Sequence, residues 1–252
     1  MEDSTFPEPR PGTSTESGGR GEPAARPNST DKAPVSLCLA SASPSRARVL
    51  EAAGLHPSLR ASDLPEGALI RAEEARLGHP LALDDLVLFL ARAKAEAVAA
   101  RLVGEGFRGL VLGCDSNFGL GDVSYGKPHT AEVARSRWRA MSGREGRLAS
   151  GHWLVDVRSG SPDRAPATGA VDVSRLWFSE VSDAEIEAYV ASGEPLEVAG
   201  GFTLEGRASA FIRRVDGSPS GILGVSVPLV RELSARLGVS WPRLCAGPRP
   251  RE

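Results

Sequence analysis

Lysine, cysteine and histidine are scarce in this sequence of 252 residues. The three cysteines, Cys38, Cys114 and Cys245, stand far apart without a CxxC pair, which indicates buried thiols in a reducing compartment. The four histidines form no HExxH or paired spacing, so we expect no histidine-based metal site. No apolar run approaches the roughly 20 residues of a membrane span, and the N-terminus lacks the apolar core of a signal peptide. We therefore expect a cytoplasmic protein without a membrane partner.

The charge balance excludes one further class of protein. A net charge of -2 and a pI near 6.2 argue against binding of a nucleic acid polymer through bulk positive charge. Only Lys32, Lys94 and Lys127 occur beside 27 arginines. Because an ammonium is a compact point charge that arginine cannot imitate, Lys94 and Lys127 are expected at positions that require lysine.

Three segments differ in composition. Residues 1–33 mix Pro, Gly, Ser, Thr and charge, and cannot bury enough apolar surface to offset the cost of ordering, so they are predicted to be a disordered tail. Residues 246–252 form a shorter C-terminal tail. The part between them, residues 35–240, is long enough for one large globular domain or a two-lobed one, with an ample core.

Strands and helices alternate along this domain. Strands are predicted over 35–41, 109–116, 151–160, 169–181 and 209–217, and helices over 44–54, 83–102, 130–143, 182–193 and 227–238. Residues 117–128 are predicted to form a hairpin. The sum is an α/β fold with a mixed, curved sheet flanked by helices.

The first predicted helix begins at "SASPSR", where Ser43 is the N-cap and Pro44 the first helical residue. Unpaired N–H groups and the positive end of the helix dipole favour an anion at such a start. Ser41 and Ser43 add hydroxyls, and Arg46 offers a guanidinium to phosphate oxygens. The alternative is a simple cap with Arg46 in solvent.

Two charged residues stand on predicted elements, one on a buried strand and one on an amphipathic helix. Asp115 follows the apolar run "GLVLGC", where a carboxylate can hold a divalent ion or orient a water; the alternative is an Asp that begins a turn. Lys94 lies on the helix 83–102, whose apolar face is predicted to hold the residues Leu86, Phe89, Leu90, Ala93 and Ala97. An ordinary solvated lysine is the alternative there.

Two further segments contain candidate site residues. "GDVSYGK", residues 121–127, matches seven positions of a phosphate loop, but Pro128 follows where Ser or Thr should hold magnesium, so we reject a P-loop. Lys127 can still reach a cleft from a hairpin. Residues 191–211 are rich in glycine and include Glu194 and Glu205, which either read a base or support a metal, or belong to an irregular surface loop.

Together these motifs resemble the Maf family of nucleoside triphosphate pyrophosphatases. "ASASPSRARVL", "ARAKAEAV", "LGCDS", "YGKP", "DAEIEAYVASGEPLEVAGGFTLEG" and "VSVPL" occur in the family's order and spacing over about residues 35–240. The resemblance implies a fold like that of the inosine triphosphate pyrophosphatases, with two lobes around a cleft. It implies an enzyme that splits a nucleoside triphosphate into the monophosphate and pyrophosphate with Mg²⁺ or Mn²⁺, in a house-cleaning role.

The resemblance also assigns roles to residues at matching positions. Asp115 is the expected proton acceptor, Lys94 and Lys127 are the cleft lysines, and Glu66 is the early acidic residue that assists Asp115 in holding the metal. The phosphate-contacting start comprises Ser41, Ser43 and Arg46.

This sequence departs from the family where its members differ in substrate. Ser45 replaces an arginine, Ser116 stands where members acting on dTTP and UTP carry Thr, Glu205 replaces a Gln, and Gly221 stands where Asn is common. The favoured base therefore stays open between a pyrimidine nucleotide and a modified one. The rival hypothesis is a non-catalytic nucleotide-binding regulator of cell division. A homodimer is a further possibility that the resemblance raises.

Overall fold

The computed structural model of the chain describes residues 33–162 and 164–249. Except for Ala33, the predicted N-terminal tail lies outside the described residues, as do residues 250–252 of the predicted C-terminal tail. The disorder of both tails and the domain boundaries therefore stay predictions.

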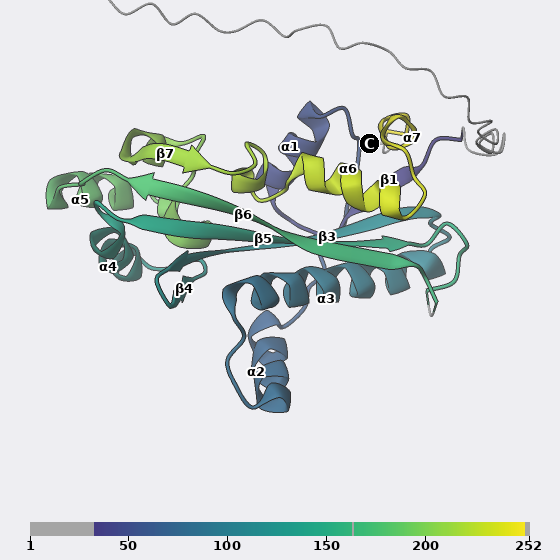
Figure 1. Cartoon of the computed structure of the whole chain (residues 1–252), viewed down its shortest axis with the longest axis horizontal. Helices are drawn as coiled ribbons and strands as arrows, with labels where there is room; N and C mark the ends of the chain where they lie inside the picture. Colours follow the sequence, from purple (N-terminus) through teal and green to yellow (C-terminus); the bar gives the residue numbers. More distant parts are fainter. Residues whose placement is uncertain (1–32, 163, 250–252) are drawn as a thin grey trace, which may run out of the picture. The chain divides into compact units, whose positions relative to one another are not determined.

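Strands and helices alternate along the described residues, as predicted (Figure 1). The strands are β1 Ser36–Leu39, β2 Ser58–Leu59, β3 Gly109–Leu120, β4 Val123–Tyr125, β5 Glu145–Asp156, β6 Ala167–Phe178 and β7 Ile212–Asp216. The helices are α1 Pro44–Ala52, α2 Glu66–Leu77, α3 Leu83–Gly104, α4 Ala131–Met141, α5 Asp183–Ala191, α6 Val227–Arg236 and α7 Trp241–Cys245. Short 3₁₀ helices follow α5 and precede α6: η1 Glu194–Glu197, η2 Ala199–Gly201, η3 Arg207–Phe211 and η4 Gly221–Leu223.

The seven strands form one mixed sheet in the order β2-β1-β3-β5-β6-β7, with β4 paired to β3. The pairs β1–β2 and β1–β3 are parallel and the others are antiparallel. Helix α3 covers one face, and α1, α6 and α7 lie over the other (Figure 1). This confirms the predicted α/β class with a mixed sheet flanked by helices.

Two hydrophobic clusters lie toward opposite ends of the long strands. One gathers Phe118 and Phe178 of the sheet with Trp138 of α4 and Ile186 of α5. The other joins residues of β1, α1, α6 and α7 around Leu112. The burial of these apolar side chains is the main force that holds the helices on the sheet.

Strand β3 has an open stretch along one edge. β1 pairs with β3 only as far as Leu112, and β4 pairs with it only from Phe118. Because β5 occupies the opposite edge along Leu110–Gly119, residues 113–117 have no strand partner on the β1 side within the described chain. The predicted end of this strand at residue 116, directly after Asp115, is therefore wrong: β5 keeps β3 extended to Leu120.

Helix α3 buries a different stripe from the predicted one. Of the predicted apolar face only Leu90 is buried, whereas Lys94 lies among the buried positions. Two glycines of the sheet explain this orientation. A Cβ atom at Gly113 would collide with the backbone of Ala91, and one at Gly151 with the backbone of Val87. The missing side chains let the backbone of α3 rest directly on β3 and β5, and so turn Lys94 toward the sheet.

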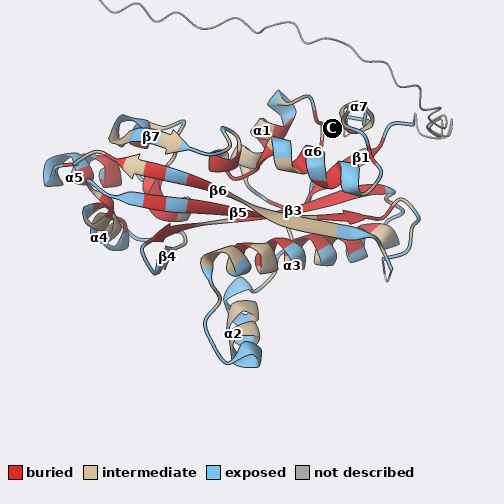
Figure 2. Ribbon diagram, in the orientation of Figure 1, coloured by how far each residue is buried: buried red, intermediate tan, exposed pale blue. Residues whose placement is uncertain are grey.

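Helix α2 was not predicted from the sequence. Its twelve residues include no buried one (Figure 2), and therefore give no apolar periodicity to detect. Its first residue is Glu66, a predicted site residue. Within the described ranges, no helix combines the length and apolar character needed to cross a membrane.

Candidate active site at the open edge of strand β3

The start of α1 faces the open edge of β3. Ser43 is the N-cap, as predicted, and its Oγ accepts a hydrogen bond of 3.5 Å from the N–H of Arg46. The Oγ of Ser41 accepts from the N–H of Ser43 at 3.2 Å. Because β1 and β3 are parallel and paired up to Leu112, the chain that leaves β1 must enter α1 beside residues 113–116.

Arg46 fastens this helix start to the sheet. Its Nη1 donates to the carbonyl of Cys114 at 2.9 Å and to Ser41 Oγ at 3.2 Å. Its Nη2 donates to Ser116 Oγ at 3.0 Å, and its Nε donates to the carbonyl of Gly224 at 2.9 Å. The guanidinium has five N–H groups, so protein contacts in the described chain use four of them and leave one on Nη2. Arg46 thus points away from bulk solvent, unlike in the simple-cap alternative, but it does not present a free two-pronged fork.

Asp115, Lys94 and Glu66 meet on the α3 side of the sheet. The Nζ of Lys94 lies 2.7 Å from Asp115 Oδ1 and 2.8 Å from Glu66 Oε1. Lys94 and Asp115 are each 8% exposed. The structure therefore brings together three of the four residues predicted to be catalytic, from β3, α3 and the first turn of α2.

Burial raises the pKa of Asp115, and the positive charges of Lys94 and Arg46 counteract part of that rise. A carboxylate of this kind holds a proton more readily than an exposed one, which suits a group that accepts a proton from water. Burial also raises the pKa of the neighbouring Cys114 thiol, to about 12, so this sulfur stays protonated and is a poor nucleophile.

Ser45 and Glu205 contact each other. Ser45 Oγ donates a hydrogen bond of 2.8 Å to Glu205 Oε1 across the space between α1 and the glycine-rich segment. Arg207, a cation two residues after Glu205, donates its backbone N–H to Glu194. Glu194 also accepts from Thr203 and Tyr189, so its role is to hold the loop together.

Lys127 lies apart from the Asp115 group. It is half-exposed, 3.8 Å from Glu197 Oε2, and His129 approaches the other oxygen of that carboxylate at 3.3 Å. The segment before Lys127 is the β3–β4 hairpin and β4 itself, which supports the rejection of a P-loop. Within the described part of the chain, Lys127 makes no hydrogen bond or ion pair with the other predicted site residues.

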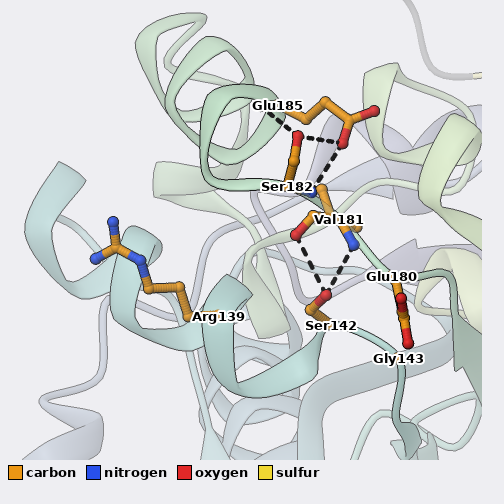
Figure 3. Close-up of a pocket in the computed structure, with 7 residues that line it drawn as sticks. All are labelled: Arg139, Ser142, Gly143, Glu180, Val181, Ser182 and Glu185. Atoms are coloured by element: carbon orange, nitrogen blue, oxygen red, sulfur yellow. Dashed lines mark hydrogen bonds between the residues drawn. The ribbon is translucent and has the colours of Figure 1, made fainter.

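A hollow of the surface lies elsewhere, at the junction of α4 and α5 (Figure 3). Its volume is about 650 Å³. Its polar groups bond to one another, as in the pairs Ser142–Val181 and Ser182–Glu185. It includes no predicted site residue.

Sequence reasoning missed two features of the site. Ser150, which is 1% exposed on β5, lies 2.8 Å from Ser116 Oγ, and Gly113 and Gly151 admit α3 to the sheet. A serine in an alternating strand has no distinguishing pattern. The glycines were visible as glycines within strands, which often mark a close approach of another backbone.

The sequence matches a known protein family. The family described as Maf, Maf-like protein, matches residues 36–237. The chain belongs to the Maf family. The matched residues include β3, the helices α1 and α3 that flank its open edge, and every predicted site residue.

Curated members of the family resemble the chain over nearly their whole length. A protein of Leifsonia xyli subsp. xyli is 50% identical over 208 residues, which are 82% of this chain and 95% of its own. Proteins of Nocardia farcinica and Saccharopolyspora erythraea are 44% and 45% identical over 214 and 211 residues, which are 84% and 83% of this chain and 97% of each of theirs. All three are named nucleoside triphosphate pyrophosphatase.

Proposed function

We propose that this Maf protein is a nucleoside triphosphate pyrophosphatase that hydrolyses its substrate between the α- and β-phosphates. The products are a nucleoside monophosphate and pyrophosphate. The observation that carries the proposal is the buried pair of Asp115 and Lys94, 2.7 Å apart, beside the open edge of β3 and the start of α1. The names of the relatives support the same activity.

In the proposed reaction Asp115 accepts a proton from the attacking water. Lys94 holds the carboxylate in place and keeps it ionised, because its ammonium lies against Oδ1. The N–H groups at the start of α1 and the charges of Arg46 and Lys127 offset negative charge on the phosphates. Lys127 reaches a phosphate once it leaves its exposed contact with Glu197.

The acidic residues suit a metal that arrives with the substrate. No group of three or more His, Cys, Asp or Glu residues in the described ranges has the arrangement of a metal site. The contacts with Lys94 use one oxygen each of Asp115 and Glu66. Mg²⁺ commonly takes one or two carboxylates together with phosphate oxygens, and the two carboxylates fit that requirement. Mg²⁺ or Mn²⁺ bound there would neutralise the triphosphate.

The hydrogen bond between Ser45 and Glu205 supports a role of these two residues in recognising the base of the nucleotide. An ionised Glu only accepts hydrogen bonds, so it favours a base edge with donors, such as the exocyclic amine of a pyrimidine or of a modified base. Ser116 is the third proposed specificity residue. Cellular nucleotides as substrates are consistent with a cytoplasmic location, which stays a prediction, as does the homodimer.

Replacement of Asp115 by Asn tests the proposed function. The loss of a general base lowers turnover by about 10²–10⁴-fold. Asp156→Asn is the matched control, because Asp156 is also a buried aspartate on this sheet and is paired with Arg158. Pyrophosphate release is measured over a panel of canonical and modified triphosphates with Mg²⁺ and with Mn²⁺. Near-normal release by Asp115→Asn contradicts the assignment, and nucleotide binding without hydrolysis by the parent favours the non-catalytic regulator.

A further inference from the structure

A closed ring of hydrogen bonds connects Arg46 with the 3₁₀ turn η4. Arg46 Nη2 donates to Ser116 Oγ, which lies 2.8 Å from Ser150 Oγ, and Ser150 Oγ donates to the carbonyl of Gly221 at 3.2 Å. The N–H of Gly224 donates to the same carbonyl at 2.9 Å, and the carbonyl of Gly224 accepts from Arg46 Nε. The guanidinium of Arg46 thus takes part in the ring with two of its atoms, Nη2 on the side of Ser116 and Nε on the side of Gly224.

The direction of every bond in the ring is determined by its two ends. Arg46 only donates and the Gly221 carbonyl only accepts. Since each serine has a single hydroxyl proton, Ser150 must give its proton to Gly221, and Ser116 must then give its own to Ser150. Ser116 consequently meets a ligand as an acceptor only, and cannot donate to a base carbonyl or a phosphate oxygen while the ring is intact.

The ring also determines where the last N–H group of Arg46 points. That group belongs to Nη2, the nitrogen bound to Ser116, and the two N–H bonds of a planar nitrogen keep a fixed angle to each other. Ser150 lies almost fully inside the sheet, at 1% exposure, so it provides a rigid anchor on β5 for a side chain of α1.

We propose that Ser150 is a positioning residue for the nucleotide phosphates. It acts through Ser116 on Arg46, and through Gly221 on the turn that supplies the second contact of Arg46. Linked hydrogen bonds of this kind strengthen one another, so the loss of one member loosens the others. The proposal rests on the proposed function insofar as Arg46 contacts a triphosphate, but it concerns binding rather than the chemical step.

Ser150→Ala opens the ring, and Ser174→Ala is its matched control. Ser174 is likewise 1% exposed, on the neighbouring strand β6, and its hydroxyl has no hydrogen-bond partner within the described chain. We expect Ser150→Ala to raise KM about three- to tenfold, the effect of one net hydrogen bond, with kcat changed less than about twofold. Ser174→Ala should leave both constants unchanged, and Ser150→Thr, which keeps the hydroxyl, should restore KM.

Two additional measurements keep the proposal testable. Ser116→Ala opens the same ring from a half-buried position, and Ser150→Ala should add little to it, since both changes break one chain of bonds. The affinity for a triphosphate with a non-hydrolysable α,β-linkage is measured for the parent and all variants. If the parent shows no pyrophosphatase activity, the proposed function is overturned, but these affinities can still be compared. Equal KM and affinity for the parent and Ser150→Ala, an equal loss in Ser174→Ala, or additive effects of the two ring variants overturn the positioning role.

Discussion

Removal of the ammonium between the two carboxylates gives the sharpest test of the site. Lys94→Met keeps the length of the side chain but removes its charge, and leaves Asp115 and Glu66 without the shared partner that lies 2.7 and 2.8 Å from their oxygens. A hydrogen bond to a charged group contributes about 1.5–3 kcal/mol, which corresponds to a rise of about one to two units in the pKa of Asp115. The Glu66 carboxylate, no longer neutralised, acts in the same direction.

The proposed base works only when ionised, so the acid side of the kcat/KM profile should move to higher pH by that amount. The stability of the variant has a definite pH dependence as well. Because the folded carboxyl binds its proton more tightly than the unfolded one, the contribution of Asp115 to stability is greatest at low pH and falls as the pH rises through the folded pKa. The deficit of Lys94→Met relative to the parent should therefore be larger at about pH 8 than at about pH 5.

Two controls accompany the measurement. Arg92→Met removes an exposed cation two residues away on the same helix, paired with Glu96, and should shift neither the profile nor the pH dependence of unfolding. Lys94→Met combined with Asp115→Asn removes both charges, and should regain stability at high pH while it stays inactive. The assigned ion pair of Lys94 and Asp115 is refuted if the acid limb of the kcat/KM profile lies at the same pH in Lys94→Met as in the parent. It is also refuted if the stability deficit of the variant grows toward low pH.

The remaining predictions concern base choice, the helix contact and a buried histidine. If Glu205 reads the base, Glu205→Gln should raise the ratio of kcat/KM for UTP over that for CTP, and an unchanged ratio removes Glu205 from the specificity residues. Gly113→Ala should push α3 off β3, because the new Cβ would collide with the Ala91 carbonyl, and should lower both Tm and turnover. The control Gly104→Ala adds its Cβ at the end of α3, where no atom lies within 4 Å, and should lower neither. Burial lowers the pKa of the His152 imidazole from 6.5 to about 4. Below pH 6.5 the unfolded chain therefore binds a proton more readily than the folded protein. The free energy of unfolding, measured in urea titrations, should fall by up to about 3 kcal/mol as the pH decreases from 6.5 toward 4. His152→Gln should flatten that part of the pH dependence; an unchanged slope assigns the acid sensitivity to other groups.

The sequence predicted the elements whose signals are local. The capped start of α1 at Ser43 has the expected contact. The predicted hairpin over 117–128 also forms, as the antiparallel pair of β3 and β4 with Gly121 in its turn. These features depend on neighbouring residues, so a short window contains all the information that forms them.

Features that depend on pairing between distant segments were not predicted. Asp115 stands in the middle of β3 because β5 pairs past it, and nothing near Asp115 in the sequence records that partner. Lys94 was noticed through its rarity among arginines, not through the helix pattern, which pointed to the wrong face. The burial of Lys94 follows from Gly113 and Gly151, on two strands separated from α3 along the chain.

The departures from the Maf pattern that the resemblance indicates occur at residues linked by contacts. Ser45 donates to Glu205, and Ser116 is linked to Gly221 through Ser150. A residue at position 45 that carried a cation would face the Glu205 carboxylate, and a side chain at position 221 would meet the Asp172 carboxylate, whose Oδ2 occupies the space beside Gly221. Substitutions in contact are coupled in their effects, whereas distant ones add independently. A change of substrate preference in this protein should therefore require changes at linked positions: an exchange at position 205 alone leaves the Ser45 hydroxyl to find another acceptor, and an exchange at 221 alone places a side chain against Asp172.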